Sequence, residues 1–75
     1  MNNKSKFIED LALKIKLERI KRNLSQEKLG ELANISRLTI GYIERGESEP
    51  SIVKVSQIAD ALNMKLCDLV KFDDI

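Results

Sequence analysis

Apolar residues along this chain recur at helical spacing, most clearly in its middle third, and no segment shows the alternation of a strand. In that third they are Leu29 and Ala33, four residues apart, followed by Ile40 and Ile43, three residues apart. This spacing places each pair on one face of a helix. The pattern therefore predicts two short helices, over residues 26–33 and 37–45, joined by a tight turn.

The residues between these two helices suit a sharp change of direction. Asn34 can adopt the positive φ that a tight helix–helix turn needs, and Gly30 lies where a missing side chain lets two backbones approach. Ser25 and Ser36 stand directly before the two helices, where a hydroxyl can cap the first backbone amides. Together these features are the signature of a helix-turn-helix of the DNA-binding kind.

Three more helices are predicted around this motif. One covers about residues 6–23, with an apolar stripe formed by Phe7, Ile8, Leu11, Ile15 and Ile20. Another follows Pro50 and Ser51, with core positions at Ile52, Val55, Ile58, Ala59 and Leu62. A short last helix covers about residues 66–71, and Lys65 before it offers no side-chain cap. The fold class is therefore all-α, a compact five-helix domain.

The length of 75 residues allows one small domain, which we place at residues 6–72 between a disordered N-terminus (1–5) and an acidic tail (73–75). Cys67 is the only cysteine and histidine is absent, so we expect no disulfide, no metal site and no cofactor. Without a signal peptide or a long apolar run, we expect a cytoplasmic protein that does not enter a membrane.

The distribution of charge is more informative than the net charge of +1. Residues 1–46 carry ten Lys or Arg against six Asp or Glu, a net +4, and residues 47–75 carry three against six, a net −3. Such a dipolar molecule would turn its basic half toward phosphates. The alternative is that the charges are simply scattered for solubility.

The segment from Leu24 to Ser51 reads LSQEKLGELANISRLTIGYIERGESEPS and resembles the lambda Cro and repressor type of helix-turn-helix domain, the xenobiotic-response-element family. The resemblance spans roughly Ile15 to Val70. It implies a lambda-repressor-like fold and a sequence-specific, double-stranded-DNA-binding transcriptional regulator that acts as a homodimer on a palindromic operator. The small stand-alone members that it resembles are Cro-like phage repressors and controller proteins of restriction–modification systems.

The second helix of the motif is the expected recognition helix, because an α-helix fits the major groove and its N-terminal side chains reach the bases. The predicted base-reading residues are Ser36, Arg37, Leu38, Thr39 and Tyr42. Arg37 could hold guanine as a fork or bridge to a phosphate, and Leu38 could contact a thymine methyl. The alternatives are a solvated charge at Arg37 and an isolated surface leucine at Leu38.

Phosphate contacts are predicted on both sides of the groove. Gln26 matches the family glutamine that contacts the DNA backbone, and the other candidates are Lys28, Arg45, Ser48 and Ser51. Glu47 and Glu49 lie in a loop that is basic in several relatives, so we expect weak binding by an isolated monomer.

Two further sets of residues have structural roles in the predicted mechanism. The resemblance implies that Arg19 and Glu44 form a partly buried brace. A C-terminal apolar cluster is the predicted dimer interface and consists of Met64, Leu66, Val70, Phe72 and Ile75. The alternative for this cluster is that it completes the core of the monomer.

Two other classes of function compete with this reading. A protein–protein interaction module, such as an antitoxin or an adaptor, would use the same fold, and Glu47, Glu49 and the small net charge favour it mildly. An enzyme is the weakest alternative, because the chain has no histidine, no paired cysteines and no glycine-rich loop.

Overall fold

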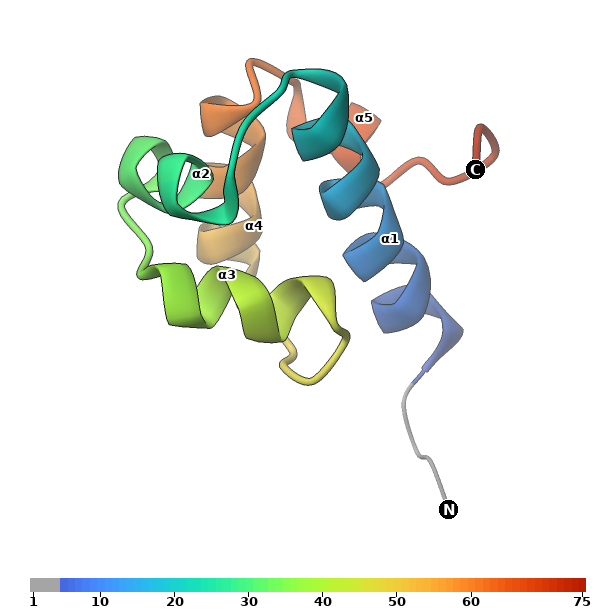
Figure 1. The fold of residues 1–75 in the computed structure, drawn as a ribbon. Helices are drawn as coiled ribbons and strands as arrows, with labels where there is room; N and C mark the ends of the chain where they lie inside the picture. Colours follow the sequence, from blue (N-terminus) through green and yellow to red (C-terminus); the bar gives the residue numbers. More distant parts are fainter. Residues whose placement is uncertain (1–4) are drawn as a thin grey trace.

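The computed structural model describes residues 5–75 and consists there of five α-helices, which confirms the predicted all-α class (Figure 1). Their bounds are Lys6–Lys21 (α1), Gln26–Ala33 (α2), Arg37–Glu44 (α3), Ile52–Ala61 (α4) and Leu66–Leu69 (α5). The disordered segment predicted for residues 1–5 falls mostly outside the described residues. Its last member, Ser5, is the N-cap of α1 and accepts a hydrogen bond from the amide of Ile8 at 3.1 Å.

Serine hydroxyls fix where the central helices begin. Each accepts a hydrogen bond from the backbone amide three residues later, which satisfies one of the free donors at a helix start. The pairs are Ser25 with Lys28, Ser36 with Thr39, and Ser51 with Lys54. Lys65 makes no such bond, as predicted, and α5 is only four residues long instead of the six expected.

Left-handed residues fix where the helices end. Asn23, Asn34 and Asn63 have φ values of 56°, 60° and 58°, and Gly46 has a φ of 71°. Asparagine tolerates this conformation better than most residues, and glycine adopts it without strain. Asn34 therefore provides the predicted turn between α2 and α3.

The approach of α2 to α3 depends on Gly30. A Cβ atom added to Gly30 would lie 2.5 Å from the backbone oxygen of Ile35, a distance that no real contact allows. The amide of Ile35 also donates a 2.9 Å hydrogen bond to the carbonyl of Gly30. The predicted close contact at this glycine is confirmed, and it sets the angle at which α3 leaves the turn.

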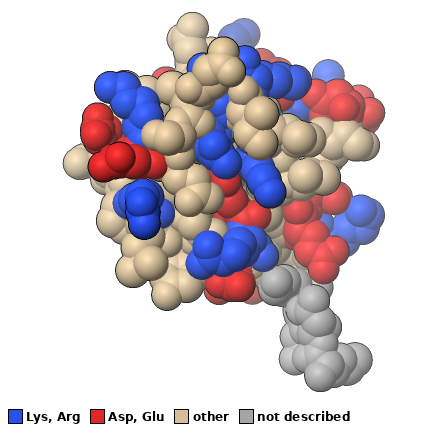
Figure 2. Space-filling model, in the orientation of Figure 1, with Lys and Arg blue, Asp and Glu red and all other residues tan. Residues whose placement is uncertain are grey.

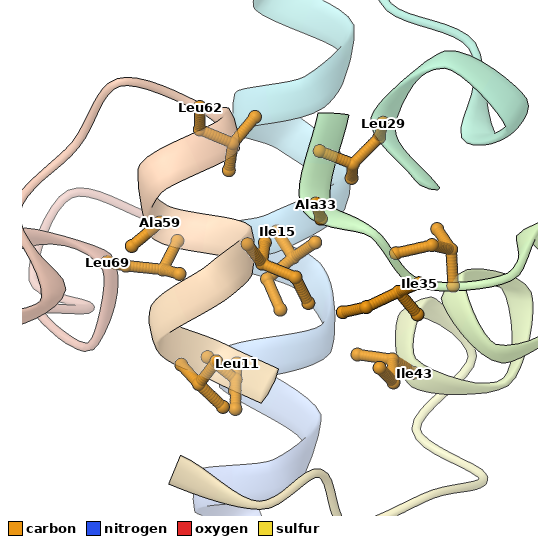
Figure 3. Close-up of a cluster of buried hydrophobic side chains, with 12 residues drawn as sticks. Leu11, Ile15, Leu29, Ala33, Ile35, Ile43, Ala59, Leu62 and Leu69 are labelled. Atoms are coloured by element: carbon orange, nitrogen blue, oxygen red, sulfur yellow. The ribbon is translucent and has the colours of Figure 1, made fainter. Parts of the chain in front are cut away.

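One apolar core joins all five helices, and its side chains converge between α1, α4 and the α2–α3 pair (Figure 3). The buried residues are Leu11, Ile15, Leu29, Ala33, Ile35, Ile40, Ile43, Val55, Ile58, Ala59, Leu62 and Leu69. The core packs one face of α3, so its position relative to the other helices is fixed. Among the described residues, no helix is long and apolar enough to cross a membrane.

Three apolar residues predicted on the core-facing pattern lie largely outside the core. Ile52 is 65% exposed because it begins α4 and precedes the turn of that helix that packs inward. Phe7 and Ile20 are about half exposed, near the two ends of α1. Phe7 instead packs against Phe72, with ring centroids 5.4 Å apart.

The predicted acidic tail is bound to the domain. Nζ of Lys14, whose side chain is buried in α1, lies 2.7 Å from both carboxylate oxygens of Asp74. The hydrogen bond from Lys14 lowers the pKa of the Asp74 carboxyl, although slight desolvation acts in the opposite direction. Residues 73–75 therefore return toward α1, on the side of the molecule away from α3 (Figure 1).

Candidate nucleic-acid interface

The outer face of α3 is open to solvent. Ser36, Arg37 and Leu38 are exposed, and Leu38 retains 65% of its accessible surface. Tyr42 is exposed one turn further along the helix, while Thr39 is half-buried. The helix lies at one edge of the domain, and α5 and the C-terminus lie at the opposite edge (Figure 1). A duplex can therefore approach this face without any movement of the chain.

The inner face of α3 packs against the hydrophobic core. Ile40 and Ile43 are buried in the core, so α3 cannot rotate about its axis to present other residues. Residues 37, 41 and 45 follow one another at steps of four along one row of the outer face, and residues 38 and 42 form a second row beside it. All five predicted base-reading residues therefore lie on the solvent side of α3 or at its border.

Ser36 differs from the other candidates because its hydroxyl is engaged within the protein. It accepts the amide of Thr39 at 3.1 Å and donates to Oγ1 of Thr39 at 2.9 Å. With its hydrogen used in this way, Ser36 could meet DNA only as an acceptor. Because Oγ1 of Thr39 is the acceptor in this bond, the Thr39 hydroxyl keeps its own hydrogen for another acceptor.

The brace between α1 and α3 is a bidentate ion pair between Arg19 and Glu44. Nε of Arg19 lies 2.7 Å from Oε2 of Glu44, and Nη2 lies 3.0 Å from Oε1. Nη1 of Arg19 also donates to the carbonyl of Leu24 in the α1–α2 loop at 2.8 Å. The side chains are 13% and 2% exposed, so this pair is nearly enclosed. It ties the far end of α3 to α1 and to the loop before α2.

Gln26, the first residue of α2, is joined to this brace. Its Nε2 donates to Oε1 of Glu44 at 3.1 Å. Because an amide nitrogen carries two hydrogens, a bond to Glu44 leaves a second hydrogen for another acceptor. The predicted phosphate contact at Gln26 therefore starts from a side chain already held in place.

The other predicted phosphate contacts also have partners within the protein. Nε of Arg45 lies 3.1 Å from Oε1 of Glu47, and its guanidinium lies 5.2 Å from the ring centroid of Tyr42. Lys28 pairs with Glu31 at 3.5 Å. These ion pairs are solvent-exposed and therefore weak, so a phosphate can compete for either cation.

Ser48 and Ser51 belong to the segment that leads into α4. Ser48 is half-buried, and Ser51 caps α4 by accepting the amide of Lys54 at 3.1 Å. The hydroxyl hydrogen of Ser51 is not used in that bond and can be donated outward. Together with the free amides at the start of α4, it forms a neutral donor group at this helix end.

Most of the predicted dimer interface packs against the monomer's own core. Met64, Leu66, Val70 and Phe72 are partly buried against the central cluster. Ile75 is 44% exposed. This end of the domain therefore combines residues that pack on the core with one exposed apolar residue, Ile75.

A buried charged cluster on α1 was not predicted from the sequence. Lys14 and Glu18 both lie inside, one turn apart at 3.7 Å, although neither is on the predicted apolar stripe. The hydrogen bond from Arg22, with a further contribution from Lys21, lowers the pKa of the Glu18 carboxyl despite its burial. Only the i, i+4 spacing of these charges could have hinted at this cluster.

On the face shown in Figure 2, basic side chains lie among acidic ones, and no broad area carries one sign of charge. Electrostatic attraction would therefore act through individual cations here. Within residues 5–75, no cluster of three or more acidic, histidine or cysteine side chains could hold a metal ion.

Comparison with known families identifies the same region of the chain. The helix-turn-helix family HTH_3 matches residues 15–69. The HTH-type transcriptional regulator YgzD of Bacillus subtilis (strain 168), itself uncharacterized, is 39% identical over 56 residues, which cover 75% of this chain and 85% of YgzD. The uncharacterized HTH-type transcriptional regulator MJ0272 of Methanocaldococcus jannaschii is 36% identical over 61 residues, which cover 81% of this chain and 92% of MJ0272.

Solved structures agree with the fold. The restriction–modification controller protein C.AhdI from Aeromonas hydrophila superposes with a TM-score of 0.83 at 28% identity, covering 87% of this chain and 98% of that one. The hypothetical transcription factor NHTF from Neisseria gives a TM-score of 0.87 at 20% identity, covering 99% of this chain and 85% of NHTF. At 20% identity, the similarity to NHTF supports the fold alone.

Proposed function

This chain belongs to the HTH_3 helix-turn-helix family of DNA-binding transcriptional regulators, which are not enzymes, and on that basis we propose that it binds a palindromic operator as a homodimer. The observation that carries the proposal is the exposed outer face of α3, held rigidly by the core and by the brace between Arg19 and Glu44. We also place the protein in the cytoplasm.

The proposed base-reading residues are Arg37, Leu38, Thr39 and Tyr42. Arg37 offers a guanidinium at the first position of α3, where it can bind O6 and N7 of a guanine. Leu38 offers an apolar surface suited to a thymine methyl, and Thr39 offers a hydroxyl oriented by Ser36. These side chains would select the sequence of each half-site.

The proposed phosphate contacts lie on both sides of this reading surface. Gln26 and Lys28 would contact the DNA backbone from the first turn of α2, with Arg45 beside Gln26 at the end of α3. Ser48 and Ser51 would contact it from the segment that leads into α4. Because Arg45 and Lys28 each have an acidic partner, DNA must displace Glu47 and Glu31 to use the full charge. We therefore propose that one protomer alone binds weakly.

Homodimerisation would compensate for this weakness. Two recognition helices double the number of base contacts and fix two half-sites about one helical turn apart, roughly 34 Å. The C-terminal surface around Ile75 and the partly exposed edge of Phe72 is the proposed contact between protomers. A selected site without inverted symmetry, bound by a single protomer, would contradict this part of the proposal.

A narrower functional class is supported by the length of the chain and by its structural similarity to C.AhdI. C.AhdI is a controller protein of a restriction–modification system and is covered almost end to end by this chain. We propose a role of that kind, with a phage-repressor-like role as the alternative. Both are small regulators whose operator would be read by α3.

Gel-shift titration at increasing salt tests the proposal against an adaptor role. For a DNA-binding protein, the logarithm of the binding constant falls linearly with the logarithm of salt concentration, because each phosphate contact releases counterions. We expect this dependence for the parent chain, and Gln26→Ala should weaken binding to all sequences about equally. An adaptor that binds only other proteins would show no duplex binding at any salt concentration.

A further inference from the structure

Gly41 lies in the middle of the outer face of α3 and yet is buried. We propose that Gly41 is a positioning residue whose missing side chain lets Arg45 and Gln26 converge into one phosphate-binding pair. This inference rests on the proposed function, because it concerns how the same surface holds the DNA backbone.

The two side chains close directly over the glycine. A Cβ atom added to Gly41 would lie 3.0 Å from Nη1 and 3.8 Å from Cζ of Arg45, and 3.7 Å from Oε1 of Gln26. Arg45 follows Gly41 by one helical turn, whereas Gln26 comes from the start of α2. Gly41 is therefore the point at which a cation from one helix and an amide from the other meet.

Contacts within the protein hold the side chains of both Gln26 and Arg45 in position. The amide of Gln26 is held by Glu44, which Arg19 holds in turn. Arg45 is steered by its ion pair with Glu47 and by its position over the ring of Tyr42. A guanidinium has five N–H donors in a flat fork, so it can keep a protein contact and still bind a phosphate.

Gly41 is not required by the fold in the way that Gly30 is. A Cβ atom at Gly30 would strike backbone, whereas the tightest contact at Gly41 is with the far end of a flexible side chain. Gly41 also has no left-handed φ. Because alanine is the better helix former, a glycine at this position lowers helix stability and calls for another explanation.

The experiment compares four proteins: the parent, Gly41→Ala, Arg45→Gln and the double variant. Each is titrated against a duplex that the parent selects from a random pool, at several salt concentrations, and its thermal unfolding is recorded. Gly41→Ala should melt at or above the temperature of the parent. Its affinity should fall about fivefold to tenfold at 0.1 M salt, and its salt slope should become shallower by about one for each bound protomer.

The double variant tests whether Gly41 acts through Arg45. If it does, the double variant binds no more weakly than Arg45→Gln, and the selected consensus is unchanged in all four proteins. A parental salt slope in Gly41→Ala, a lower melting temperature, or losses that add in the double variant would each overturn the inference. If the parent selects no duplex at all, it is the proposed DNA binding that fails.

Discussion

Arg19 provides the sharpest test of how the recognition helix is held. Its guanidinium contacts both carboxylate oxygens of Glu44 and the carbonyl of Leu24, and the Glu44 side chain is only 2% exposed. Arg19→Ala would leave a buried carboxylate with Gln26 as its remaining partner. Breaking a buried pair in this way costs about 3–5 kcal/mol, because the remaining charge has neither water nor a counter-charge.

That cost is a large part of the stability of so small a domain. At 0.05–0.15 kcal/mol per residue, 75 residues give a free energy of unfolding of about 4–11 kcal/mol. One kcal/mol corresponds to about 4–8 °C in a domain of this size, so the melting temperature of Arg19→Ala should fall by at least about 12 °C. Thermal unfolding followed by circular dichroism measures this directly.

Arg22→Ala is the matched control, because it removes the same kind of side chain from the same helix. Arg22 is more exposed, and its partner Glu18 keeps Lys14 and Lys21. We expect a loss of about 1 kcal/mol or less. In the Arg19→Ala background, Glu44→Gln should recover part of the lost stability by removing the buried charge. Equal melting temperatures for Arg19→Ala and the parent would refute the reasoning, as would a changed sequence preference in protein that remains folded.

Three further substitutions have distinct expected outcomes. Gly30→Ala should prevent folding, because its Cβ would lie 2.5 Å from the backbone oxygen of Ile35, and a cooperative unfolding transition in this variant would contradict that. Glu18→Gln should be less stable than the parent at about pH 6, and the difference should shrink as the pH falls below 4.5, as denaturant titrations over this pH range would reveal. The lowered pKa of Glu18 adds stability above its ordinary pKa of 4.5, and that stability is lost as the pH falls through the folded-state pKa. Ser36→Ala should lower the free energy of unfolding by about 1 kcal/mol, because α3 loses its N-cap. A gel shift should also show weaker DNA binding, because Thr39 loses its hydrogen-bond partner. Unchanged stability would mean that the cap contributes little.

The sequence predicted the elements whose determinants are local. The bounds of α2 match the structure because Ser25 and Asn34 act on backbone groups within a few residues of themselves. The contact at Gly30 was predictable for the same reason, since the turn that needs it is next to it in the chain. Ile52 was misplaced because helical spacing gives the face of a residue but not how far the packed part of a helix extends.

The features that the sequence did not predict depend on residues far apart in the chain. The burial of Lys14 depends on Asp74, sixty positions away, and no local pattern joins the two. The role proposed for Gly41 depends on Gln26 lying over α3, which follows only once α2 and α3 are packed together. In both cases the tertiary arrangement, not the local spacing, decides the environment of the side chain.

Selection of bound duplexes from a random pool tests the central claim most directly, because the claim is that the outer face of α3 reads DNA sequence. The parent should enrich an inverted repeat with half-sites about one helical turn apart. Arg37→Ala should lose preference at one position in each half-site and keep the rest. A pool without enrichment, or a consensus that Arg37→Ala leaves unchanged at every position, would contradict the claim.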